Sequence, residues 1–340
     1  MEPSGLQITW YLLFGGLLAG YAVLDGFDLG AGVLSLFTRS ERDKRLFINA
    51  IGPVWDGNEV WLITAGAALF AAFPPVYASV FSGFYLALML LLVGLILRAV
   101  ALEFRGQVDS PRWRRLWDWS FGLGSLVPAL LFGVAVGNIL LGLPLDANGD
   151  YSGTFVELLH PYALLIGLLG LVMFVCHGAL YLAMKTEGEL AARLRRWAGR
   201  AWMGWVGLFV LATVATFFCA PARMEGLLGS VCFWLVLALL LAGLAGLPLT
   251  LRAGRGGWAF LLSSAAICAQ LALVGLSLYP ALVPAAGGGV ALTIAGASSS
   301  ARTLTTMLVI AAVGMPLVLA YTVFIYRTFR GKVVLDEHSY

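Results

Sequence analysis

Five ionisable side chains lie within long apolar segments of the sequence, where charged groups are rare and costly. Asp25 and Asp28 lie in the first apolar segment, Asp56 and Glu59 in the second, and Arg98 in the third. Each acidic pair has i, i+3 spacing, so its two members share one face of a helix. Carboxyls held together away from water cannot all be ionised, so at least one is expected to hold a proton. These residues therefore predict proton binding and transfer, with Arg98 as the counter-ion.

The two acidic segments are expected to form an antiparallel helical hairpin, with its connecting loop centred near Glu41. At ~1.5 Å per residue, Asp25 and Asp56 would both lie roughly 15 Å above the same membrane edge. Three or four carboxyls are thus expected to converge near mid-membrane. Two roles stay open for them. They form a proton relay, or Asp25, Asp56 and Arg98 form an ion pair that only holds helices or subunits together.

The elements that position these residues are membrane-spanning helices. Of the 340 residues, 61% are hydrophobic and 11% are charged, whereas soluble domains have about one quarter charged residues. Nine apolar segments are long enough to cross a bilayer: 8–36, 46–72, 77–104, 116–142, 159–184, 200–220, 229–250, 257–279 and 303–329. We expect an all-α polytopic membrane protein with one transmembrane domain over residues 1–340. Its helices would form two four-helix bundles, a candidate pseudo-repeat of 8–142 and 159–279, and one peripheral helix at 303–329.

Basic residues are concentrated in alternate connections between these segments. The stretches 39–45, 105–115, 185–200, 252–255 and 327–332 hold 18 of the 21 Lys and Arg residues. Basic connections face the cytoplasm in membrane proteins. The N-terminus is therefore predicted to lie outside and the C-terminus inside, as an odd number of spans requires. The lipid bilayer is the surrounding medium, and nothing in the sequence predicts nucleic-acid binding.

Other residue types with potential chemistry are better explained by packing. His177 lies deep in an apolar segment, but no second His or Met has a spacing that fits a haem site, so a hydrogen-bonded packing role is favoured. His160, next to Pro161, indicates a helix start, and His338 lies in the tail. Glu103 and Asp118 are expected to anchor helix ends at the interface. The four cysteines are expected to be small buried residues. No metal site and no self-contained active site are predicted.

Several motifs resemble those of subunit II of the cytochrome bd-type quinol oxidases. The run Tyr21–Gly30 resembles the first signature of that family, and Pro53–Gly66 resembles its second and most specific one. Further matches are Phe81–Tyr85, Trp117–Trp119, Gly133–Asn138 and Trp258–Phe260. The resemblance covers nearly the whole chain. The Trp55–Trp61 sequence is also similar to that of the cyanide-insensitive branch.

The resemblance implies a haem-bearing partner, subunit I, with two b-type haems and one d-type haem. Subunit II would bind no haem, would stabilise subunit I and would contribute to a proton path from the cytoplasm. The position of Asp56 belongs to that path in the family. Some relatives hold a structural quinone in this subunit, and a small single-helix accessory subunit is a further candidate partner. Quinol and oxygen would be the substrates of the complex, which would lie in the bacterial cytoplasmic membrane.

Two other classes of protein share some of these features. A proton-coupled secondary transporter also uses buried acids with a counter-ion. Against it, the acidic motifs all lie in one half of the chain, with no counterpart in the other. A purely structural membrane scaffold would use the same acids only to hold helices together. Haem absorption in a co-purifying partner would favour the oxidase.

Overall fold

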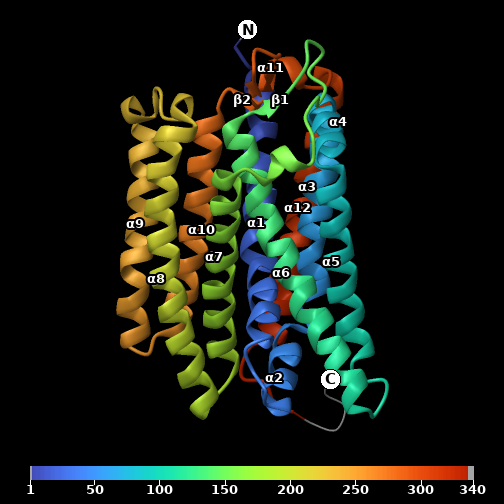
Figure 1. The fold of residues 1–340 in the computed structure, drawn as a ribbon, viewed down its shortest axis with the longest axis vertical. Helices are drawn as coiled ribbons and strands as arrows, with labels where there is room; N and C mark the ends of the chain where they lie inside the picture. The colour runs from blue at the N-terminus through green and yellow to red at the C-terminus, as the bar shows by residue number, and fades with distance from the viewer. Residues whose placement is uncertain (1, 336–340) are drawn as a thin grey trace.

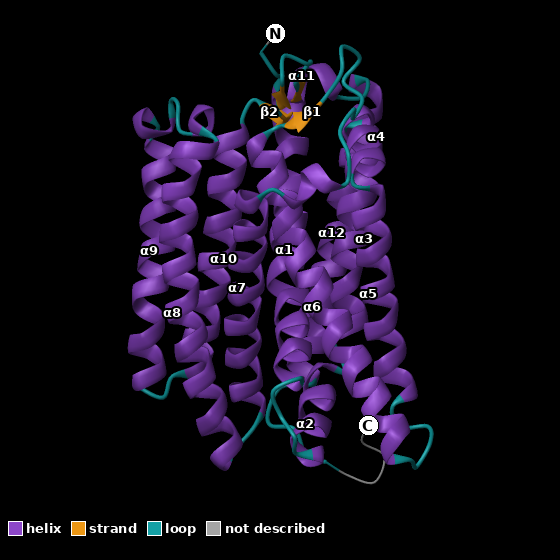
Figure 2. Ribbon diagram, viewed as in Figure 1, coloured by secondary structure: helices purple, strands orange, loops and turns teal. Residues whose placement is uncertain are grey.

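The computed structural model describes residues 2–335, and its main feature is a layer of long, roughly parallel helices (Figure 1). The helices are α1 (Gly5–Ser35), α2 (Glu41–Ile51), α3 (Trp55–Ala72), α4 (Pro74–Gly83), α5 (Tyr85–Phe104), α6 (Pro111–Leu141), α7 (Pro161–Lys185), α8 (Gly188–Cys219), α9 (Val231–Arg252), α10 (Gly256–Leu278), α11 (Ile294–Ala297) and α12 (Ala301–Thr328). Strands are confined to short pairs at one end of the bundle (Figure 2).

Nine of the described helices correspond to the nine predicted spans. Eight helices are long and apolar enough to cross a membrane by themselves. The ninth is α3, an 18-residue helix whose polar first turns, with Asp56, Asn58 and Glu59, lower its hydropathy. It packs along α1. The prediction of an all-α polytopic membrane protein is therefore confirmed.

The second predicted span, 46–72, is wrong in its boundaries because two helices share it. Ser40 caps the start of α2 by accepting a hydrogen bond from the Asp43 amide. Helix α2 is amphipathic and buries Phe47 and Ile51 at its end. Pro53 follows, and because proline has no backbone N–H to continue the helical hydrogen-bond pattern, the chain turns before α3 begins at Trp55. Asp56 therefore lies in the first turn of α3.

Other predicted boundaries shift for similar local reasons. The third span is divided into α4 and α5 at Phe84. Helix α8 begins twelve residues before the predicted residue 200, because the arginine-rich segment also carries the buried residues Leu190, Leu194 and Ala198 on one face. The segment 280–302, between the last two predicted spans, contains β2 (Ala281–Val283), β3 (Ala285–Ala286), β4 (Leu292–Thr293) and α11. Strand β3 pairs in parallel with β1 (Leu143–Pro144), and β2 pairs with β4 in antiparallel.

The long helices form two groups of four with one helix beside them. Helices α1, α3, α5 and α6 pack together, and α7, α8, α9 and α10 form the second group. The groups meet where α6 and α1 both pack on α7. There a Cβ on Gly30 would lie only 2.0 Å from the carbonyl oxygen of Phe174, so glycine allows the close approach. Helix α12 lies along α1 and α3 and buries only Leu304. The internal repeat of 8–142 and 159–279 stays a prediction.

The two ends of the bundle differ in character. The connections α1–α2, α5–α6, α7–α8 and α9–α10 lie at one end, together with the end of α12 (Figure 1). The basic stretches of the sequence lie in these connections and in the adjoining ends of the helices, and we call this the basic end. The short strands and α11 cover the opposite end (Figure 2). There the Trp10 indole nitrogen donates a hydrogen bond to the Leu304 carbonyl at 2.9 Å, which ties α1 to α12.

Candidate functional site: a buried charged cluster

Arg98 of α5 is the centre of a cluster of charged groups inside the first bundle. Its guanidinium Nη2 donates to Asp25 Oδ1 of α1 at 2.8 Å and also to Glu59 of α3. The side chains of Arg98 and Asp25 are fully buried, whereas Glu59 is 23% exposed. The predicted counter-ion is thus placed against two of the four predicted acids. The cluster joins three helices.

Asp28 lies one turn along α1 and belongs to a neighbouring hydrogen-bond chain. Its Oδ2 accepts from Asn58 Nδ2 at 2.7 Å, and the same nitrogen donates to the Leu24 carbonyl at 3.0 Å. Asn58 Oδ1 accepts from the hydroxyl of Tyr326 in α12 at 3.0 Å. Asn58 was part of the recognised motif, but Tyr326 gave no signal in the sequence, because nothing in the sequence places the last helix against α3.

Asp56 does not join the buried acids. It is exposed, and the described residues include no hydrogen-bond or ion-pair partner for it. The helical period explains this, because Asp56 shares the outward face of α3 with Val60 and Ile63, which are 42% and 70% exposed. Asn58, by contrast, faces inward toward α1. The predicted convergence therefore includes Asp25, Asp28 and Glu59, with Asp56 on the adjoining surface.

Several polar atoms in the cluster are buried without a hydrogen-bond partner among the described residues. They are Asp25 Oδ2, Asp28 Oδ1, the Tyr21 hydroxyl, and Arg98 Nε and Nη1. Buried polar atoms are almost always hydrogen-bonded in native proteins, often to ordered water. The site therefore has the donors and acceptors to hold water beside its carboxyls, which is the arrangement that proton transfer through a membrane interior requires.

A second charged network lies at the basic end and holds α2, α5 and α6 together. Arg105, just after α5, donates to both carboxylate oxygens of Glu41 at 2.8 Å and to Asp118 at 2.7 Å. Lys44 also contacts Asp118 at 2.8 Å. Burial lowers the pKa of Arg105, but hydrogen bonds with Asp118 and Glu41 outweigh that effect and raise it, so this arginine stays charged. Asp118 is thus an inter-helix ion-pair partner and not only an interfacial anchor, whereas Glu103 is exposed.

The described histidines occupy structural positions. His177 is fully buried. Its Nε2 donates to the Val23 carbonyl at 3.0 Å, and its Nδ1 lies 2.7 Å from the Ser263 hydroxyl. The ring stacks on Phe260 with centroids 4.4 Å apart. Both ring nitrogens are engaged, as the packing interpretation predicts. His160 caps α7 by accepting from the Tyr162 amide, and His338 lies outside the described residues.

The cysteines follow the prediction only in part. Cys176 is buried, but Cys219, Cys232 and Cys268 lie on exposed helix faces. The sequence prediction that all four are buried was wrong for these three, because an apolar segment in a membrane protein has a face toward lipid as well as a face toward protein. Among the described residues, no group of three His, Cys, Asp or Glu side chains could hold a metal ion.

Fold and site together define a class: a multi-pass helical membrane protein with a protonatable ion-pair cluster in one of two bundles. The comparison with protein families is more specific. Residues 6–329 match the family model for cytochrome bd terminal oxidase subunit II, and the chain belongs to this family. The predicted recognition is thereby confirmed.

Individual relatives agree with this membership along the full chain. The chain is 37% identical to cytochrome bd-I ubiquinol oxidase subunit 2 of Escherichia coli strain K12, over 98% of this chain and 96% of that protein. It is 32% identical to cytochrome bd ubiquinol oxidase subunit 2 of Bacillus subtilis strain 168, over 98% of both. Its fold is similar to a chain in the structure of bd oxidase from Geobacillus thermodenitrificans, with a TM-score of 0.80 at 19% identity, covering 96% of this chain and 99% of that one.

Proposed function

We propose that this chain is the haem-free subunit II of a bd-type quinol oxidase and that its carboxyl cluster takes part in proton uptake for oxygen reduction. Family membership makes the chain a subunit of a quinol oxidase complex, and therefore implies a partner subunit I. In this proposal subunit I binds the b and d haems, while this chain stabilises it and supplies a protonatable route. The main observation in support of this proposal is that Glu59 contacts the buried Arg98 while its side chain remains 23% exposed.

The proposed route begins at the surface and leads inward along α3. Asp56 is exposed, and Glu59 follows it one turn later on the way to Arg98. Asp25 and Asp28 lie deeper, and each has one carboxylate oxygen without a hydrogen-bond partner in the part of the chain that the structure describes. A proton taken up at Asp56 would pass to Glu59 and then, through water hydrogen-bonded to the unpartnered atoms, to the buried acids.

The proposed direction is from the cytoplasm, in the bacterial inner membrane. Support comes from the basic connections, which all lie at one end of the bundle (Figure 1). By the positive-inside rule this end faces the cytoplasm. Asp56, in the first turn of α3, lies toward that end. Quinol oxidation outside and proton uptake inside would make the reaction electrogenic without a pump.

The competing interpretation, in which the acids only hold helices together, applies to some of these residues and not to others. Asp25 and Arg98 are fully buried and bridge α1 and α5, so they hold helices together whether or not protons move. Asp56 is outside this bridge, contrary to the predicted trio of Asp25, Asp56 and Arg98. Replacing Asp56 therefore tests proton transfer without removing the ion pair. The buried acids all belong to the first bundle, which gives no support to a secondary transporter with acids in both halves.

Asp56→Asn keeps the size of the side chain but removes its ability to carry a proton. We expect the purified complex to assemble with full haem content, because Asp56 has no partner among the described residues. Its oxygen uptake with quinol should fall about tenfold or more. Asp56→Glu is the matched control and should recover part of the rate. Haem content and turnover are measured on the same preparation. Full turnover in a well-assembled Asp56→Asn complex would remove Asp56 from the route.

Other features implied by the family resemblance remain proposals. They are a structural quinone in this subunit, a small single-helix accessory subunit, and membership of the cyanide-insensitive branch. A spectrum, a subunit count and a quinone extraction of the affinity-purified complex would test the first two. Cyanide titration of oxygen uptake would test the third.

A further inference from the structure

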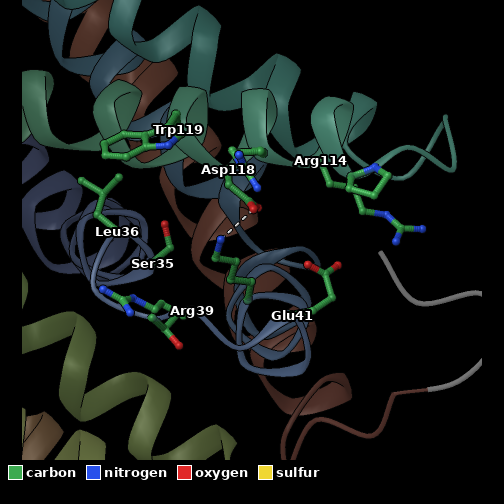
Figure 3. A pocket seen from close by; sticks show the side chains of 11 residues that line it. Ser35, Leu36, Arg39, Glu41, Arg114, Asp118 and Trp119 are labelled. Carbon is green, nitrogen blue, oxygen red and sulfur yellow. Dashed lines mark hydrogen bonds and ion pairs between the residues drawn. The ribbon is translucent and has the colours of Figure 1, made fainter.

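A cleft of about 560 Å³ opens at the basic end, outside the buried charged cluster around Arg98. It lies between the end of α1, the start of α2 and the first turns of α6 (Figure 3). Its charged lining consists of Arg39, Glu41, Lys44, Arg114, Arg115 and Asp118. In Figure 3, Leu36 and Trp119 lie on one side and Arg114 on the other, with the Lys44–Asp118 ion pair drawn as a dashed line.

The charges in this cleft do not cancel. Asp118 is shared between Lys44 and Arg105, and Glu41 also pairs with Arg105. Both acids of the lining are therefore already neutralised. Arg39 and Arg115 are exposed, and no acidic partner for either is found among the residues that the structure describes. A positive surplus consequently faces the open space of the cleft and favours an anion there.

The walls of the cleft are fixed before any ligand binds. Arg105, whose side chain is 2% exposed, joins Glu41 of α2 to Asp118 of α6. Ser35 and Thr38 in the lining are also buried. A pre-organised site loses less conformational entropy on binding than flexible surface side chains do. This pre-organisation applies to the walls of the cleft, whereas the Arg39 and Arg115 side chains are exposed.

An apolar stripe connects the cleft to the membrane. Leu116, Trp119 and Leu123 are 56%, 54% and 46% exposed on α6, and their spacing places them on one face of the helix. The stripe starts at the cleft, where Trp119 is part of the lining. Tryptophan is enriched at the headgroup level of membranes. A ligand with a charged head and apolar chains would match both surfaces.

We propose that this cleft binds the phosphate headgroup of an anionic phospholipid, with Arg39 and Arg115 as its charge contacts and the acyl chains lying along α6. Basic pockets between transmembrane helices on the cytoplasmic side bind such headgroups. The Leu116–Trp119–Leu123 stripe favours a lipid over a soluble phosphate. The site is independent of the proposed proton route, since it shares no residue with it.

The test uses the purified complex of this chain with its partner subunit, in mild detergent. Native mass spectrometry follows binding of dioleoylphosphatidylglycerol, with zwitterionic dioleoylphosphatidylcholine as the comparison lipid. We expect one saturable phosphatidylglycerol per complex. Each lost charge should weaken binding about fivefold, so that Arg39→Gln/Arg115→Gln should weaken it about 25-fold. Both side chains are exposed, so the variant should assemble normally.

The matched control is Arg223→Gln/Arg302→Gln, which removes two arginines at the opposite end and should bind like the wild type. Arg39→Lys/Arg115→Lys keeps the charge and should retain binding within a few-fold. Unchanged phosphatidylglycerol affinity in Arg39→Gln/Arg115→Gln would overturn the proposal. So would equal binding of both lipids, or displacement of the lipid by millimolar inorganic phosphate, which would indicate a site for a soluble anion.

Discussion

Removal of one charge from the buried ion pair should destabilise the complex in a measurable way. In Asp25→Asn, the amide oxygen can still accept a hydrogen bond from Arg98, but the negative charge 2.8 Å from the guanidinium is lost. Breaking a fully buried pair costs about 3–5 kcal/mol, because one charge is left uncompensated. Glu59 remains beside Arg98, so we expect the lower end, about 3 kcal/mol, or roughly a 150-fold shift in the unfolding equilibrium.

The three acids differ in burial, so the expected loss of stability differs from one variant to the next. Glu59→Gln should cost only about 1 kcal/mol, because its side chain is 23% exposed and water can replace part of the lost interaction. Asp56→Asn should stay within about 0.5 kcal/mol. The triple variant Asp25→Leu/Glu59→Gln/Arg98→Met should be more stable than Asp25→Asn, because it leaves neither Arg98 nor Glu59 as an unpaired charge.

The measurement is a titration of each purified complex with sodium dodecyl sulfate, followed by the haem absorption of the complex and by size-exclusion chromatography. Wild-type stability in Asp25→Asn would refute the reasoning, because it would mean that Asp25 carries no net charge beside Arg98. Equal losses in Asp25→Asn and Asp56→Asn would also contradict it, since they would show that burial does not set the cost.

Three further predictions concern packing and topology. His177→Ala should keep every haem band of the complex but lower its stability by about 2–3 kcal/mol, because it leaves buried hydrogen-bond partners unpaired. An absorption spectrum checks the haem bands, and a detergent titration checks the stability. Loss of one haem band at full protein level would contradict this prediction. Gly30→Ala should destabilise the chain by about 3 kcal/mol or more, because its methyl group would clash with Phe174. Gly66→Ala is the control and should be neutral, since a Cβ there would have nothing within 4 Å. Equal melting temperatures of the two variants would refute the close-approach argument. A reporter fused after Tyr340 should be active only in its cytoplasmic form, and an active periplasmic phosphatase fusion there would overturn the nine-span orientation.

Much of the architecture follows from the sequence because a bilayer restricts it so strongly. Length and apolarity identify the spans, since a chain in lipid must satisfy its backbone within helices. The basic stretches mark one end of the bundle before any contact is known. The family signatures around Asp25 and Asp56 predict subunit II of a bd-type oxidase, which the family comparison confirms. The i, i+3 spacing also predicts that Asp25 and Asp28 share a face.

The sequence could not determine which acids meet, because that depends on how each helix is rotated about its axis. Asp56 and Glu59 belong to one motif, yet packing of Asn58 against α1 turns Asp56 to the outer surface and leaves Glu59 at Arg98. Apolarity cannot reveal this rotation, since lipid-facing and protein-facing residues of a membrane helix are equally hydrophobic.

The tertiary structure also decided the break between α2 and α3, where a predicted single span becomes an amphipathic helix and a shorter membrane helix. It brought the Tyr326 hydroxyl to Asn58 across 268 positions of the chain, and it formed the cleft at the basic end from the ends of three helices. Sequence periodicity is local, so it determined the elements and their polarity. Contacts between distant elements depend on packing of complete surfaces, and only the folded chain supplies those.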